Sequence, residues 1–531
     1  MRRVCLAVVV LLAVGLSGCI RAPSGTTGEV ARISRLDTGV LRVGLTERIN
    51  TLDPVYAVTS AERFAVHNLY SGLVSIGAEG YPVPELAESW NVSQDGQVYT
   101  FVLREGLTFH DGTPLTAKDV ERSLTRALLK DTGAPDAMKY LSDIVGSRES
   151  LQGRVQSVAG IKVLDARTIS ITLYGPRAHF LSKLAEPVAY IVPETVDPER
   201  PVGSGPFSFL AWEKSGRVGF AAFPGYLPGP PEIERLEVYY NEDQIELATR
   251  YMEGFFQVID VTPSLVPWVR DREELRGQLL EVAGPTVFYI GLNGGAYEPF
   301  ADPLVRRAMA LALDRETLVK EVWKGTRIPA RGYVPPGIGG PAENDAIRFD
   351  PEEARRLLDS AGYKPEEMPE LVICIPDAPV GQLLGEYYAR SFSENLGLSI
   401  RLESLEWSDF LSRLYDRQMH AFSLGWEGDY HDPHAFVAMP FHSKSPFNEL
   451  RYVNAEVDKL IERAEREADL AVRKELYRQA EALVLSDTPW IPVYHGALYY
   501  LVVPELRGLG VTSAGLTSQA QVTYSIGEPA D

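Results

Sequence analysis

The chain has 531 residues, of which 45% are hydrophobic and 23% are charged, as in a soluble globular protein with room for several domains. Its formal net charge is −20. A surface this acidic repels phosphate backbones, so the composition argues against nucleic acid as a partner.

The N-terminus has the features of an export signal. Arg2 and Arg3 precede an apolar run from Val4 to Leu16, which is too short to span a bilayer but has the length of a signal-peptide core. The run ends at Leu16-Ser17-Gly18-Cys19, which resembles the lipobox of bacterial lipoproteins. We therefore predict a signal peptide over residues 1–18, acylation of Cys19 and a flexible tether over residues 19–37. The alternative is an ordinary secretory leader in which the cysteine stands by chance.

The three cysteines fit this prediction. Cys5 would leave with the leader and Cys19 would carry lipid, so only Cys374 remains as a free thiol. No disulfide is then expected within the mature chain. Cys374 lies in the apolar run Leu371–Ile375, which predicts a core position on a buried strand.

The first third of the folded body alternates strand and helix signals. Gly39–Leu45 predicts a strand, and Phe64–Leu73 has apolar residues at helical spacing. Asp95-Gly96 predicts a hairpin turn before an alternating strand over residues 98–104. Thr116 with Asp119 three residues later is an N-terminal capping pair, which predicts a helix through Leu128.

The later part of the chain repeats this alternation. Asp302-Pro303 and Asp350-Pro351 are each an N-cap followed by proline at the first helical position, ahead of an apolar stripe. Two further stripes predict helices, and three apolar runs predict strands: Val457 to Ala464 and Leu476 to Val484 for the helices, Val287–Leu292, Leu371–Ile375 and Leu398–Leu402 for the strands. The interleaving favours α/β lobes.

Several of these segments together resemble one known family. They are Leu69–Leu73, Pro84–Trp90, Thr108–Leu115, Pro201–Phe207 and Asp302–Arg315. All resemble the extracellular solute-binding proteins, family 5, of bacterial ABC importers, the class that contains the periplasmic dipeptide-, oligopeptide- and nickel-binding proteins. The resemblance extends from about Leu41 to Val503.

The resemblance implies a periplasmic-binding-protein-like, two-lobed α/β fold of the class II, cluster C type, with a hinge and a smaller inserted third lobe. On this chain we expect the first lobe at residues 38–60, 196–284 and 494–531. The inserted lobe would take residues 61–195 and the second large lobe residues 285–493. The chain would cross between the large lobes near Gly284-Pro285 and Ile491-Pro492, and closure about these crossings would bury ligand.

The stretch Leu424–Pro433 is the candidate ligand site. Gly425 and Gly428 let a backbone approach closely, Trp426 offers a flat apolar wall, and Asp429 supplies a negative charge. These features fit an extended ligand that ends in a cation. Taken alone, they fit better a glycine-rich loop that closes a strand and whose carboxylate faces water.

The resemblance adds specific roles. It implies that Asp429 holds the α-ammonium of a peptide, because an aspartate of a similar segment does so in peptide-binding members. It also implies that the peptide main chain pairs with Gly425, Trp426 and Glu427 and with Val58, Thr59 and Ser60, as an added strand. Ser423 departs from the family, because some oligopeptide binders carry an arginine there for the ligand carboxylate. The partner of that carboxylate and the ligand length therefore stay open.

Two alternatives keep the fold and change the ligand. Four of the eight histidines, His420, His431, His434 and His442, lie in one region and could serve a nickel or metal-chelate site, although histidines of a polar loop are the simpler interpretation. Trp426 could equally stack on an oligosaccharide. No metal-binding motif with Cys-x-x-Cys or His-Glu-x-x-His spacing is present.

An enzyme is the alternative from another class. The sequence contains no Gly-x-Ser-x-Gly elbow, phosphate loop or nucleotide fingerprint. We therefore predict a monomeric lipoprotein, anchored to the outside of the cell membrane through Cys19, that binds peptides without turnover or cofactor. Its partners would be the permease subunits of an ABC importer and their ATPase.

Overall fold

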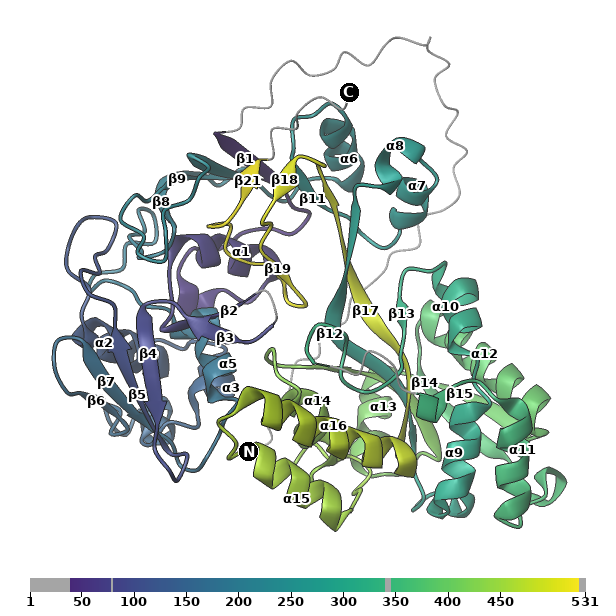
Figure 1. Cartoon of the computed structure of the whole chain (residues 1–531). Helices are drawn as coiled ribbons and strands as arrows, with labels where there is room; N and C mark the ends of the chain where they lie inside the picture. Colours follow the sequence, from purple (N-terminus) through teal and green to yellow (C-terminus); the bar gives the residue numbers. More distant parts are fainter. Residues whose placement is uncertain (1–38, 78–79, 340–344, 525–531) are drawn as a thin grey trace, which may run out of the picture. The chain divides into compact units, whose positions relative to one another are not determined.

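The computed structural model describes residues 39–77, 80–339 and 345–524, and Figure 1 gives their course. The predicted signal peptide, the predicted acylation site Cys19 and the predicted tether lie outside these residues. From Thr38 onward the chain forms one unit.

A large mixed sheet runs through this unit. Its strands are β1 (Val40–Gly44), β8 (Phe207–Glu213), β9 (Arg217–Ala222), β10 (Arg235–Tyr239), β11 (Val258–Asp260), β12 (Leu279–Leu292), β13 (Ile328–Pro329), β14 (Leu371–Pro376), β15 (Ile400–Leu405), β16 (Ala421–Glu427) and β17 (Trp490–Val502). Their order is β15-β14-β16-β12-β17-β11-β1-β10-β9-β8, and β13 pairs with β17 outside this series. The pairs of β1 with β10 and β11, and of β14 with β15 and β16, are parallel, and the others are antiparallel.

The two longest strands lie in the middle of this order. β12 and β17 pair from Leu279–Leu501 to Gly291–Trp490, and their register shifts between Ala283 and Val287. Gly284-Pro285 lies at this shift, and Ile491-Pro492 lies near the start of β17. Both predicted crossings therefore fall inside paired strands, and the lobe boundaries themselves stay a prediction.

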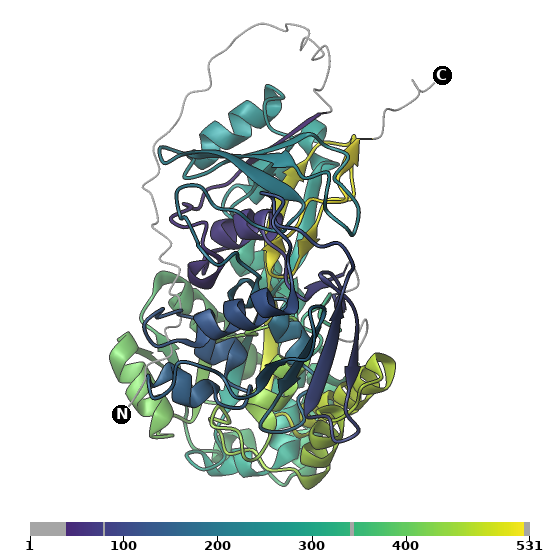
Figure 2. The same ribbon diagram turned by 90° about the vertical axis from the view of Figure 1, so that its left-hand side faces the viewer.

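A four-stranded antiparallel sheet forms separately between α1 (Ser60–Leu69) and β8 in the chain, and this part of the chain also includes α2 (Ala117–Leu128). Its order is β4 (Ala87–Val92), β5 (Val98–Leu103), β7 (Thr168–Thr172) and β6 (Ile161–Val163). The predicted turn at Asp95-Gly96 is confirmed, because it joins β4 to β5. Tyr99, Phe101 and Leu103 are buried, and α2 packs against β6 and β7 (Figures 1 and 2).

Sixteen α-helices lie within the described residues. They are α1 (Ser60–Leu69), α2 (Ala117–Leu128), α3 (Ala137–Leu141), α4 (Ser147–Leu151), α5 (Phe180–Leu184), α6 (Gln244–Met252), α7 (Val266–Arg270), α8 (Glu273–Arg276), α9 (Pro303–Leu311), α10 (Arg315–Trp323), α11 (Pro351–Ser360), α12 (Pro379–Leu396), α13 (Trp407–Tyr415), α14 (His434–Phe441), α15 (Ala455–Ala464) and α16 (Leu470–Asp487). The helices predicted from the two Asp-Pro starts and from the two later stripes are confirmed as α9, α11, α15 and α16.

Short elements complete the description. Two-stranded sheets pair β2 (Val74–Ile76) with β3 (Pro82–Pro84), β18 (Leu506–Arg507) with β21 (Thr523–Tyr524), and β19 (Val511–Thr512) with β20 (Gly515–Leu516). The 3-10 turns are η1 (Pro54–Tyr56), η2 (Pro187–Ala189), η3 (Glu298–Ala301), η4 (Asp345–Ile347) and η5 (Pro365–Glu367).

Both predicted boundaries of one helix were wrong. The helix expected over Phe64–Leu73 begins earlier, at Ser60, and ends at Leu69. The cause is a capping box, in which Thr59 Oγ1 accepts from the backbone N–H of Glu62 at 3.2 Å and Glu62 Oε2 accepts from the N–H of Thr59 at 3.2 Å. The residues predicted to pair with a ligand, Val58 to Ser60, therefore lie at the N-terminus of α1.

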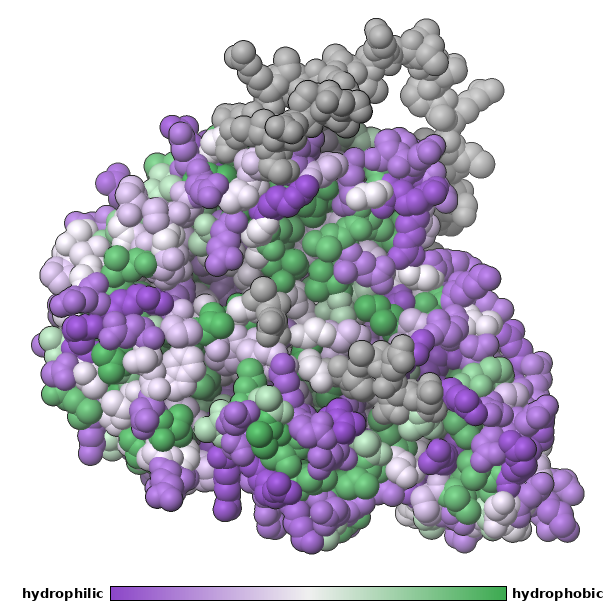
Figure 3. All heavy atoms as spheres, viewed as in Figure 1, coloured by the Kyte–Doolittle hydropathy of each residue, from purple (hydrophilic) through white to green (hydrophobic). Residues whose placement is uncertain are grey.

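The buried side chains and the surface agree with a protein that folds around an apolar core. Cys374 is buried in the largest apolar cluster, as predicted, and burial raises the pKa of its thiol to about 11. Figure 3 shows hydrophobic residues mixed with hydrophilic ones on the visible face. None of the helices in the described part of the chain has the length and apolarity needed to cross a bilayer.

Candidate ligand-binding site

The outer edge of β16 carries the first part of the candidate site. On one side β16 pairs with β12, and the N–H of Gly428 continues this pairing to Pro285 at 2.8 Å. Because successive backbone groups of a strand point to opposite sides, the N–H and C=O groups of Gly425 and Glu427 point away from β12. On that side β14 pairs only with Ala421 and Phe422, and no other described strand continues the pairing. The two residues therefore present unpaired main-chain groups.

Asp429 lies two residues beyond the end of β16. Its side chain is 34% exposed, and its Oδ1 lies 2.9 Å from the Nζ atom of Lys139 on α3. The hydroxyl of Tyr140 donates to the main-chain oxygen of Asp429 at 2.7 Å. The carboxylate is thus held in place by α3 and is still within reach of solvent, which suits the binding of a cation.

Trp426 is anchored in the protein core by one end. Its indole N–H donates to the carbonyl of Ala435 at 2.8 Å, and its ring packs at 5.9 Å from Phe447 and 6.2 Å from Trp490. The side chain is partly exposed. Trp426 therefore braces the strand beside the site and leaves part of its ring available as a wall.

The second predicted segment, Val58 to Ser60, has two of its N–H groups engaged. Those of Val58 and Thr59 both donate to the Glu62 carboxylate, at 3.1 and 3.2 Å. The Val58 carbonyl accepts from Arg63 Nε at 3.4 Å, and the Val58 side chain is 48% exposed. A ligand strand along this segment would therefore have to exchange these contacts.

A chain of charges joins this segment to α3. Arg63 of α1 forms ion pairs with Asp136, at 2.9 Å, and with Glu186. Asp136 is the N-cap residue of α3, the helix that carries Lys139. The two predicted halves of the site, at Val58–Ser60 and at Gly425–Asp429, are thus linked through Arg63 and α3.

The residues that follow Asp429 are buried, which corrects their assignment to a polar loop. His431 and His434 are 8% and 9% exposed. The ring of His431 lies between the carbonyl of Gly337, at 3.0 Å, and the hydroxyl of Ser513, at 2.9 Å. The reason is that both rings contact residues distant in the chain, Gly337 and Ser513 for His431 and Glu465 for His434.

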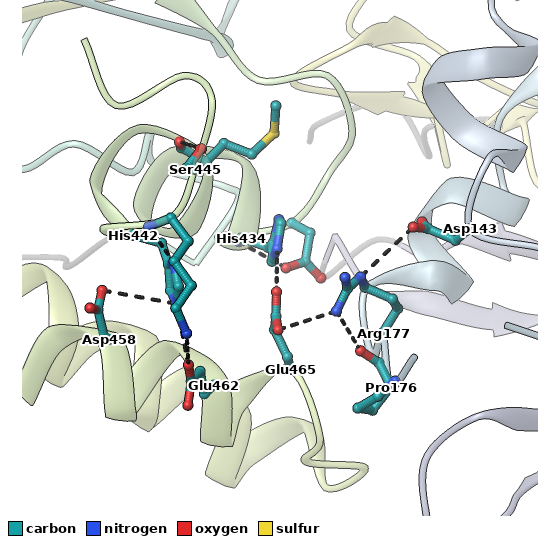
Figure 4. Close-up of polar contacts among 12 residues, drawn as sticks. Asp143, Pro176, Arg177, His434, His442, Ser445, Asp458, Glu462 and Glu465 are labelled. Carbon is teal, nitrogen blue, oxygen red and sulfur yellow. Dashed lines mark hydrogen bonds and ion pairs between the residues drawn. The ribbon is translucent and has the colours of Figure 1, made fainter. Parts of the chain in front are cut away.

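Figure 4 shows the polar contacts around His434 and His442. His434 Nε2 lies 3.1 Å from Glu465, which also pairs with Arg177 at 3.3 Å, and Arg177 lies 3.7 Å from Asp143. Burial lowers the pKa of His434, and the Glu465 carboxylate only partly opposes this.

His442 stands apart from His434 in a second set of contacts, 3.9 Å from Asp458 and 3.6 Å from Glu462. The histidines are thus used to join elements. Among the described residues, no group of three or more histidine, cysteine, aspartate or glutamate side chains could hold a metal ion.

Sequence reasoning missed Lys139, Tyr140 and Arg63. Lys139 and Tyr140 lie on a five-residue helix, and nothing in the spacing of that segment distinguishes them from ordinary surface residues. The signal that could have found Arg63 is the capping box at Thr59, since a helix start there places Arg63 one turn inward from Val58.

The comparison with protein families decides the class. The family model of the bacterial extracellular solute-binding proteins, family 5, matches residues 81–448. The chain belongs to this family. The resemblance stated from the sequence motifs is confirmed, and the family is one of extracellular solute-binding proteins of transporters rather than of enzymes.

Relatives within the family 5 proteins cover nearly the whole chain. The dipeptide-binding protein DppE of Bacillus subtilis is 28% identical over 94% of this chain and 95% of its own length. The heme-binding protein A of Haemophilus influenzae is 29% identical over 80% of this chain and 81% of its own. Family membership alone thus leaves the ligand of this family 5 protein to be argued from its site.

A solved structure confirms the fold. The periplasmic murein tripeptide-binding protein MppA, in its unliganded open form, matches with a TM-score of 0.86 at 22% identity, covering 92% of this chain and 98% of that one. The predicted two-lobed α/β fold is therefore confirmed for this family 5 protein.

Proposed function

We propose that this family 5 protein is the substrate-binding lipoprotein of an ABC importer, and that it captures short peptides and delivers them to a membrane permease. The observation that carries the proposal is the position of Asp429, a partly exposed carboxylate two residues beyond a strand edge with unpaired main-chain groups. An extended peptide has a group to match each of these features. Its terminal ammonium can pair with the carboxylate, and its main-chain donors and acceptors can pair with the strand edge.

The proposed binding mode gives affinity without reading side chains. The peptide ammonium pairs with Asp429, its main chain pairs with Gly425 and Glu427, and its first side chains lie along Trp426. Val58 to Ser60 would face the ligand from the side of α1. Because main-chain pairing is common to all peptides, the preference for side chains is broad.

We also propose a location for the protein and partners at the membrane. Cys19, once acylated, tethers the folded body outside the membrane beside the permease and its ATPase, and the protein acts as a monomer. No reaction is assigned to it, so peptides leave unchanged.

Native mass spectrometry of the body after Cys19, as purified from cells, tests the ligand class. We expect a ladder of added masses that fit short peptides, which also measures their length. A mass increment of a haem, a metal ion or a hexose, with no peptide series, would contradict the proposal. Recovery of cleaved peptide after incubation would contradict binding without turnover.

A further inference from the structure

The carboxylate of Asp429 has a cation of the chain itself beside it. Lys139 Nζ lies 2.9 Å from Asp429 Oδ1, and the two side chains are 35% and 34% exposed. Lys139 ends in a primary alkylammonium, the same chemical group as the amino terminus of a peptide. The side chain of Lys139 therefore stands where a ligand ammonium would be expected.

The contact is presented by a supported element. Asp136 at the start of α3 is held by Arg63, and Tyr140, the residue after Lys139, donates to the main chain of Asp429 at 2.7 Å. The Lys139 ammonium also lies 5.0 Å from the centre of the Tyr140 ring. Burial alone would lower the pKa of Lys139, but Tyr140 and Asp429 outweigh it and the pKa is raised. The side chain of Lys139 thus carries a full positive charge at neutral pH.

We propose that Lys139 is an internal counter-ion, which fills the ammonium position at Asp429 while the site is empty and is displaced by the amino terminus of the ligand. This inference rests on the proposed function. Two ammonium groups on one carboxylate would stand about 5 Å apart and repel each other, so binding of the ligand favours the departure of Lys139.

Two other carboxylates can accept the ammonium of Lys139 once it leaves Asp429. Asp136 attracts its charge from the same helix, and Glu186 interacts with it from the N-cap of η2. Both carboxylates also pair with Arg63. The cluster of Asp136, Glu186 and Arg63 therefore has two carboxylates and one guanidinium, and it can accept a second cation such as Lys139. The displaced ammonium therefore moves from one carboxylate to others within the same network.

The exchange makes the site selective for charged amino termini. An N-acylated peptide offers a neutral amide, which cannot neutralise Asp429 and so cannot replace Lys139. A free amino terminus can, but its net gain is reduced by the lysine contact that it breaks. Lys139 thus sets both the chemical class of ligand and its affinity.

Calorimetry on the mature chain tests this with alanine peptides of two to five residues, each with a free and with an acetylated amino terminus. Lys139→Gln removes the competing charge, so we expect about three- to tenfold tighter binding of the free peptides, the scale of a partly exposed ion pair. Lys139→Arg restores the pair and should bind as the wild type does. Lys118→Gln, an equal charge change at an exposed position of α2, is the matched control.

Nitrogen-15 NMR of the lysine side chains in the wild type gives a second measurement. The Nζ resonance of Lys139 should shift when a free peptide is bound and stay unchanged with the acetylated peptide, with no change at Lys118 in either case. Weaker or unchanged binding by Lys139→Gln, or an unchanged Nζ resonance of Lys139, would overturn the proposal that Lys139 is a counter-ion. Failure of the proposed function is distinguishable, because then Asp429→Asn would bind free peptides as the wild type does, or no peptide would bind to any variant.

Discussion

Arg473 and Asp432 form an ion pair that is almost entirely removed from solvent, with Nη1 and Oδ2 2.7 Å apart and side chains 6% and 1% exposed. Asp432 also accepts from the N–H of His434 at 3.0 Å. The pair joins α16 to the segment directly after Asp429. The pair thereby holds in place the segment that follows Asp429.

Replacing Arg473 by alanine should therefore destabilise the fold. The Asp432 carboxylate would be left buried without its counter-charge, which typically costs about 3 to 5 kcal/mol. Urea unfolding measures this loss. Arg478→Ala on the same helix is the control, since Arg478 pairs with Glu475 at the surface and should change stability by under about 1 kcal/mol. Equal losses in the two variants would contradict the argument.

Asp429→Asn should weaken the binding of peptides with a free amino terminus. Unpairing a buried charge costs about 2 to 5 kcal/mol, and since a third of this side chain is exposed we expect a loss near 2 kcal/mol. Calorimetry compares this variant with Glu427→Gln, a neutral replacement at an exposed neighbour. Unchanged affinity in Asp429→Asn would remove this carboxylate from the site.

The edge of β16 can be tested through a single N–H group. Glu427→Pro removes the donor that points away from β12, whereas Glu427→Ala keeps it. We expect proline to weaken peptide binding by about 1 kcal/mol relative to alanine, the usual contribution of one hydrogen bond. If the two variants bind peptide equally, the peptide main chain does not pair with this edge.

Stability should depend on pH through Glu481. This side chain is 2% exposed and accepts from the N–H groups of Tyr333 and Val334 at 2.6 and 2.9 Å. Burial raises its pKa from 4.5 to about 7, against the effect of these two bonds. Between those pH values the folded protein holds a proton that the unfolded chain has lost. The free energy of unfolding therefore falls as pH rises, and the contribution is fully lost above about pH 7.

Glu481→Gln accepts the same two bonds and does not titrate. Its unfolding free energy relative to the wild type should rise by about 3 kcal/mol between pH 4.5 and pH 8. Glu394→Gln, at an exposed position of α12, should show no such rise. A pH-independent difference for Glu481→Gln would mean that this carboxyl does not titrate in the window.

The predicted lipid anchor can be tested by comparing two cysteines. Cys19→Ser should abolish incorporation of labelled fatty acid, because no acylated residue would remain. Cys374→Ser should keep the label, since Cys374 is buried in the folded body. Lipid labelling that persists in Cys19→Ser would contradict the lipobox prediction.

Local sequence signals predicted much of the fold. Asp302-Pro303 and the Asp95-Gly96 turn act within a few residues, so their outcome does not depend on distant contacts. The helix predicted from Asp302 ends at Leu311, and Asp314 caps the separate helix α10 by accepting from the N–H of Thr317 at 3.1 Å. The apolar stripe gives no warning of this break, because Ala312 and Leu313, beyond the end of α9, are as buried as the stripe within it.

The candidate site was only partly predictable. Asp429 and the glycines around it stand out from composition and from resemblance. Lys139 becomes visible only in the fold, since 290 positions in the sequence separate it from Asp429 and neither residue type predicts the other. His431 and His434 were misjudged for the same reason, as their burial comes from distant partners such as Gly337 and Glu465.

The register shift between β12 and β17 sets three residues, 284 to 286, opposite the single residue Gly496. The ladder is locally disrupted there, while the strands on both sides stay paired. Since both predicted crossings fall within this paired ribbon, closure about them would deform the two strands together. Torsional compliance of this short segment would then set how fast the proposed closure occurs, separately from how tightly the closed site holds its ligand.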